Sequence, residues 1–153
     1  MAGRIETCVN GLAEDQIWAR TSDNENAIGN LVLHLSGNVR QWIVAGVGGR
    51  ADTRQRDAEF AARGGGSGTE LVAGLKGAVE EACGVLAEAT PERLSEHIVV
   101  QHYDVTVLEA IYHVVEHFSG HTGQIIFATK MLTGTDLGFY QHLRDAAHGR
   151  KTP

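Results

Sequence analysis

The chain has 153 residues, of which 42% are hydrophobic and 21% are charged, and its formal net charge is −6. These values are typical of one globular domain and exclude a disordered or collagen-like chain. No run of about 18 apolar residues occurs, so no membrane span is expected. An acidic chain repels the phosphate backbone of nucleic acids, which are therefore not expected partners.

The two cysteines, Cys8 and Cys83, are too few for a disulfide framework. The first nine residues contain no apolar signal region. We therefore expect a cytoplasmic protein with a single domain over residues 1–150. Residues 151–153 are expected to form a frayed tail.

Apolar residues recur at helical spacing in four segments, which predicts four amphipathic helices. In chain order these segments are residues 2–18, 25–45, 69–89 and 105–132. Residues 20–24 are rich in helix-capping types and precede the second helix, and Gly134 closes the fourth. A short C-terminal helix is predicted over residues 137–147. This pattern favours an all-α fold, a four-helix bundle.

Two connections are less regular. Residues 46–68 begin and end with glycines and carry a charged stretch between them. A connection of this length is longer than most links between helices, and such a link is either functional or mobile. Residues 94–104 alternate weakly around Ile98, Val99 and Val100, which is compatible with an extended pair or with a loop.

Three histidines follow one another at a four-residue step in the last helix: His113, His117 and His121. Side chains four residues apart leave the same helix face, so two neighbouring imidazoles can chelate one metal ion. On the helical wheel, His117 and His121 lie closer to the apolar stripe than His113 does. Phe118 follows His117 where zinc proteases carry glutamate, so that protease motif is absent.

His34 is the one histidine of the second helix and lies at the edge of its apolar stripe. With His117 and His121 it would supply three neutral nitrogen donors. Such a set leaves coordination positions open for water or substrate, as catalytic metal sites do. The same spacing also occurs among surface or hydrogen-bonded histidines, and spacing alone leaves this alternative open.

Two motifs resemble those of the DinB/YfiT-like superfamily. The first is NLVLHLSGN over residues 30–38 with RQWI over residues 40–43, and the second is HFSGHTGQI over residues 117–125. The charged stretch over residues 54–60 resembles sequences from one subgroup of that superfamily, and the function of this subgroup is unassigned. The resemblance implies an up-down-down-up four-helix bundle, often a homodimer. It also implies one divalent metal ion, commonly nickel or zinc, on His34, His117 and His121.

The resemblance further implies a thiol-dependent transferase or isomerase that uses a low-molecular-weight thiol such as bacillithiol or mycothiol and acts on a small-molecule substrate. The metal would deprotonate the thiol, so the catalytic group would be metal-bound thiolate or water rather than a protein side chain. One alternative is a hydrolase that uses metal-bound hydroxide. Another is a non-catalytic, dimeric metal-binding module.

Asn38 and Gln124 lie close in sequence to the predicted ligands. Gln124 follows His121 by three residues and Asn38 follows His34 by four, so both side chains could hydrogen-bond a ligand imidazole or a metal-bound water. An ordinary polar position at the flank of a helix explains both residues equally well.

Arg54 and Arg56 are candidates for binding an anionic substrate, because a guanidinium forms forked hydrogen bonds with a carboxylate. The alternative is that both arginines pair with acidic neighbours and order the long connection. Those neighbours are Asp52, Asp57 and Glu59.

Overall fold

The computed structural model describes residues 1–143, which form a bundle of helices with one small hairpin. The α-helices in this range are α1 (Ala2–Asn10), α2 (Glu14–Ile17), α3 (Ile28–Val39), α4 (Arg56–Ala61), α5 (Gly68–Ala87) and α6 (Val107–Thr133). A π-helical segment, Arg40–Val47, continues α3. The strands are β1 (His97–Val100) and β2 (Tyr103–Thr106), and short 3₁₀ turns cover Glu92–Ser95 and Gln141–Leu143.

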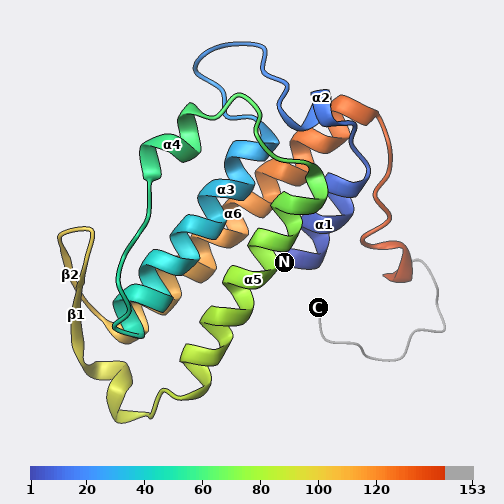
Figure 1. Ribbon diagram of the computed structural model, residues 1–153. Helices are drawn as coiled ribbons and strands as arrows, with labels where there is room; N and C mark the ends of the chain where they lie inside the picture. Colours follow the sequence, from blue (N-terminus) through green and yellow to red (C-terminus); the bar gives the residue numbers. More distant parts are fainter. Residues whose placement is uncertain (144–153) are drawn as a thin grey trace.

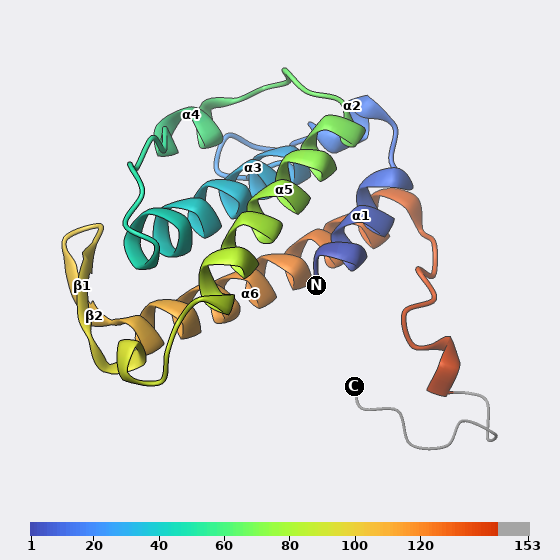
Figure 2. The same ribbon diagram turned by 60° about the horizontal axis from the view of Figure 1, so that its bottom comes forward.

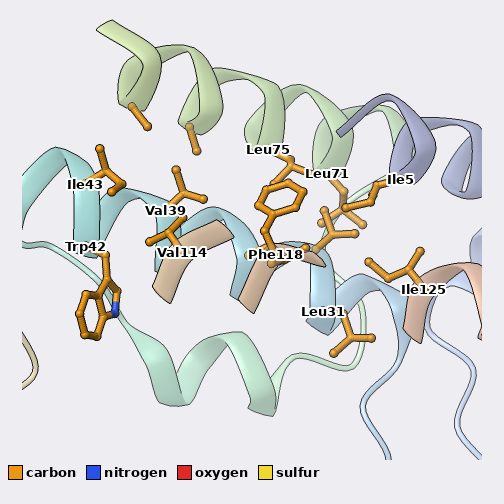
Figure 3. Packing of buried hydrophobic residues seen from close by; sticks show 14 of the residues in the cluster. Ile5, Leu31, Val39, Trp42, Ile43, Leu71, Leu75, Val114, Phe118 and Ile125 are labelled. Atoms are coloured by element: carbon orange, nitrogen blue, oxygen red, sulfur yellow. The ribbon is translucent and has the colours of Figure 1, made fainter. Parts of the chain in front are cut away.

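The bundle consists of α1, α3, α5 and α6. α3 and α5 run in one direction while α1 and α6 run in the other (Figures 1 and 2), so the expected up-down-down-up four-helix bundle is confirmed. Its core is apolar and includes the fully buried Ile5, Ile43 and Leu75. In Figure 3, Ile43 points toward α5, whereas Trp42 points away from it, so the π-helical segment is buried on two sides.

The direction of the helices explains the long connection after α3. Because α3 and α5 are parallel, the chain must return along the whole bundle before α5 can begin (Figure 1). Helix α3 and its π-helical continuation span residues 28–47, a length of about 30 Å at 1.5 Å per residue. The returning chain forms the short helix α4, which packs against α3.

The first two predicted helices differ from the observed ones at their boundaries. The helix expected over residues 2–18 is divided into α1 and α2, since the chain leaves the helix at Gly11, a poor helix former. The second helix begins at Ile28 rather than at residue 25. The residue that precedes it is Ala27, whose backbone N–H donates to Asn30 Oδ1 at 3.1 Å, so the capping-rich segment at 20–24 does not cap it.

The segment over residues 94–104 contains most of an antiparallel hairpin, which continues to Thr106, as the extended alternative predicted. β1 pairs with β2 with Val100 opposite Tyr103, and the turn residues Gln101 and His102 have φ angles of 50° and 68°. Positive φ at both central residues is the geometry of a tight two-residue hairpin turn. The hairpin packs against the π-helical segment, where the Tyr103 and Trp42 rings stack at 6.4 Å.

The end of α6 agrees with its prediction, because Gly134 terminates the helix in the left-handed conformation at φ 66°. The short helix expected over residues 137–147 is wrong for residues 137–140, where Gly138 also has a positive φ and the backbone is not helical. Within residues 1–143, the 3₁₀ turn Gln141–Leu143 follows. Residues 144–147 and the expected frayed tail at 151–153 lie outside the described range. No helix within that range combines the length and apolarity that a membrane span requires.

Candidate metal centre

Three histidine rings meet where α3 packs against α6. His34 Nε2 lies 3.1 Å from His117 Nε2, and His121 Nε2 lies 3.2 Å from the same atom. One nitrogen from each ring falls within 4.8 Å of the other two. Nitrogens bound at 2.0–2.1 Å to a tetrahedral zinc ion are about 3.3 Å apart, so a small adjustment lets these rings share one ion.

His113 lies outside this cluster, as the helical wheel predicted. Its ring packs on Trp42 at a centroid distance of 4.0 Å, and its centroid is 5.6 Å from that of His117. Helix α6 therefore contributes the rings of His117 and His121 to the cluster, and the His113 ring packs on Trp42 beside them.

The connection between α3 and α5 brings a charged pair to the outer side of His34. Glu59 Oε2 is 3.1 Å from His34 Nδ1, and Arg54 donates from Nε and Nη2 to the two Glu59 oxygens at 2.8 Å each. The Arg54 side chain is 3% exposed and that of Glu59 is 11% exposed. Arg54 therefore pairs with Glu59, which is the alternative to substrate binding that the sequence left open for this arginine. Arg56 lies over the ring of Phe60 at 4.9 Å.

The sequence suggested Glu59 as a partner of the two arginines but not as a neighbour of His34. Its only signal is its place in the charged stretch, five residues after Arg54. Nothing local in the sequence indicates that this stretch returns to His34, which lies 25 residues earlier.

The two polar neighbours of the ligands behave differently. Gln124 Oε1 lies 2.6 Å from His121 Nδ1, so the amide oxygen can accept the ring proton and leave Nε2 free for an ion. Asn38 is 3% exposed, and its Oδ1 has no hydrogen-bond partner within residues 1–143. His117 Nδ1 is also buried without a hydrogen-bond partner within these residues.

Burial keeps the α6 histidines neutral. Burial, with smaller contributions from the neighbouring His121 and His34 rings, lowers the pKa of His117 to about 4, and burial also lowers the pKa of His121. For Glu59, burial raises the pKa, but hydrogen bonds from Arg54 and His34 outweigh it and bring the pKa below its ordinary value. A neutral imidazole is the form that binds metals, so the donor set fits a divalent ion at neutral pH.

Comparison with solved structures shows the same architecture in a DinB-like protein, YjoA, from Bacillus subtilis. The two chains superpose with a TM-score of 0.68 over 91% of each chain, at 19% sequence identity, which establishes the shared fold. No curated protein matches the chain. The family model described as "Protein of unknown function (DUF1572)" matches residues 2–143, so the chain belongs to this DinB-like family.

Proposed function

We propose that the protein binds one divalent metal ion, nickel or zinc, through the Nε2 atoms of His34, His117 and His121. The observation that carries this proposal is the convergence of three imidazoles from two helices, with Nε2 separations of 3.1 and 3.2 Å. The described cluster contains no cysteine or carboxylate ligand, so an ion bound there would keep its full double positive charge and open positions.

We further propose that the centre serves a thiol-dependent transferase or isomerase. A divalent ion in this site would favour the thiolate form of a small thiol that reaches it. The sulfur would come from outside the chain, because neither Cys8, which is buried in the apolar core, nor Cys83, which is exposed on α5, belongs to the histidine cluster. Of the two arginines that the sequence suggested for an anionic substrate, Arg56, exposed on α4, does not pair with Glu59 in this way.

Two experiments test these steps. Tag-free protein should contain or take up about one equivalent of nickel or zinc, and His117→Ala should not. If the centre accepts sulfur, adding a low-molecular-weight thiol to the nickel or cobalt form should change its visible absorption. An unchanged spectrum with several thiols, together with ester or amide hydrolysis that His34→Ala abolishes, would instead favour a hydrolase.

We also propose that the protein forms a homodimer through the outer face of α6. Large apolar side chains on this face are between 49% and 72% exposed: Leu108, Tyr112, Val115, Phe127 and Met131. A surface of this kind on a single helix is typical of a contact with another chain.

The order of residues along α6 favours a second copy of the same helix as the partner. An antiparallel α6 that crosses between Ser119 and Gly120 would pair four of these five apolar side chains with one another, as a twofold interface requires. The resulting pairs are Leu108 with Met131, Glu109 with Lys130, and Tyr112 with Phe127. Small residues at the crossing allow the two helices to approach closely.

Sedimentation equilibrium tests this pairing. Phe127→Glu should weaken the dimer at least tenfold, whereas Val99→Glu, at a similarly exposed position on the hairpin, should not. A monomeric wild-type protein, or equal effects of both substitutions, would contradict the pairing.

A further inference from the structure

Two groups of opposite charge face the same nitrogen of His34. Nδ1 lies 3.1 Å from Glu59 Oε2 and 2.9 Å from Arg54 Nη2. A ring nitrogen that carries a proton can donate to the carboxylate, and one without a proton can accept from the guanidinium, but it cannot do both. The position of one proton therefore decides which contact forms.

That choice also determines the state of the nitrogen that faces the other histidines. When Nδ1 donates to Glu59, Nε2 has a free lone pair directed toward His117. When Nδ1 accepts from Arg54, the ring proton of a neutral His34 lies on Nε2 and blocks a metal ion. Only the first arrangement is compatible with the proposed centre.

We propose that Glu59 is the positioning residue of the metal centre: it accepts the Nδ1 proton of His34 and thereby presents Nε2 to the ion. This inference rests on the proposed metal binding and adds a residue that does not touch the metal. A carboxylate in this position also increases the basicity of the ligand imidazole. The positive charge of Arg54 offsets that of the carboxylate, so the pair adds no net charge to the site.

The surrounding structure holds both the backbone and the carboxylate of Glu59. Asn30 Nδ2 donates to the Glu59 backbone carbonyl at 2.7 Å, and Arg54 holds both carboxylate oxygens. Arg54 in turn donates from Nη1 to Gln41 Oε1 at 2.8 Å, and Gln41 donates to Asp52 at 2.7 Å. The carboxylate is thus held in place without depending on the ion.

Gly37 on α3 provides the space that this arrangement needs. A Cβ atom at this position would lie 2.0 Å from Glu59 Oε1 and 2.9 Å from Arg54 Nε. A glycine within a helix destabilises it relative to alanine. At position 37 this cost accompanies the close approach of the charged pair to the helix. Any larger residue would displace the carboxylate from His34.

The test compares zinc affinities, measured by competition with a chromogenic chelator. Glu59→Gln and Gly37→Ala should each bind zinc about 10–100-fold more weakly than wild type, the loss typical of removing a partner of a ligand histidine. Asp57→Asn makes the same charge change two residues away on the exposed face of α4, and Gly74→Ala adds a methyl group in open space on α5. Both controls should bind like wild type.

A second variant covers the case in which a single substitution prevents folding. Arg54→Met combined with Glu59→Leu removes the pair without leaving a buried charge unpaired, and it should show the same loss of affinity. In zinc-loaded wild type, ¹⁵N-resolved ring spectra should show the His34 proton on Nδ1, with slow exchange. In Glu59→Gln that proton should exchange faster, a change that a purely structural role would not produce.

The outcomes separate this inference from the function on which it rests. If wild type binds no zinc, the proposed centre is wrong and the role of Glu59 falls with it. If His34→Ala abolishes binding but Glu59→Gln and the double variant bind like Asp57→Asn, the centre stands and the role of Glu59 is overturned.

Discussion

The two helices that carry the histidines hold their rings in different ways. On α3, the His34 ring lies against Phe60 at 4.6 Å, and its Nδ1 faces a buried charged pair. On α6, His121 has one amide partner, and His117 Nδ1 has none within the described part of the chain. The α3 half of the site is therefore preformed, whereas the α6 half is free to adjust when an ion binds.

The largest expected effect is the loss of a ligand. His34→Ala and His117→Ala should each reduce nickel or zinc affinity by more than the 10–100-fold typical of removing a ligand's neighbour, so that metal no longer copurifies. Elemental analysis of tag-free protein measures this directly. His113→Ala is the matched control, since that ring packs on Trp42 outside the cluster. A normal metal content in His34→Ala would remove α3 from the site.

The second effect concerns stability. Arg54→Met leaves the buried Glu59 carboxylate without its guanidinium, and it should lower the free energy of unfolding by about 3–5 kcal/mol. Arg56→Met should cost about 0.5–1 kcal/mol, because that guanidinium is exposed and stacks on Phe60. Urea denaturation of the metal-free chains measures both values. Equal losses of stability in the two variants would show that the Arg54–Glu59 pair does not stabilise the α3 half of the site.

A smaller effect is expected on the α6 side. Gln124→Leu removes the acceptor of the His121 Nδ1 proton, and it should weaken zinc binding by about tenfold or less, at the lower end of such losses. The effect should be smaller than that of Glu59→Gln, since the amide is neutral and exposed. A loss in Gln124→Leu that exceeds the loss in Glu59→Gln would reverse the comparison between the two helices.

The smallest effect is a dependence of stability on pH. The pKa of His117 is about 4 in the folded chain, below the ordinary value of 6.5, so the unfolded chain binds more protons between these values. The metal-free protein should therefore lose stability as pH falls from about 6.5 to about 4, and this contribution should stay constant below that range. Thermal denaturation at pH 7 and pH 5 measures it. His117→Gln should show a smaller difference, and an unchanged difference would mean that this ring is not buried.

The features that the sequence predicted are those set by local periodicity. The histidine spacing on α6, the choice of His117 and His121 over His113, and the end of the helix at Gly134 all follow from a 3.6-residue repeat or from glycine's backbone freedom. The edge position of His34 on the second helix follows from the same repeat.

The features that the sequence did not predict depend on contacts between distant segments. Glu59 reaches His34 because the parallel arrangement of α3 and α5 forces the chain back along the bundle. The 3.6-residue periodicity of the sequence carries no information about that path. The turn at Gln101 and His102 lacks the Asn-Gly or Asp-Gly signal of tight hairpins. The path of the chain around Gly138 likewise departs from the helix that the sequence pattern favoured.

X-ray absorption at the nickel edge, at protein and metal concentrations high enough to load the weakened His34→Ala variant, tests the central claim most directly. Three imidazole rings around the metal are expected, falling to two in His34→Ala and remaining three in His113→Ala. A coordination shell made of oxygen alone, or one that does not change in His34→Ala, would contradict the convergence of α3 and α6 on a single ion.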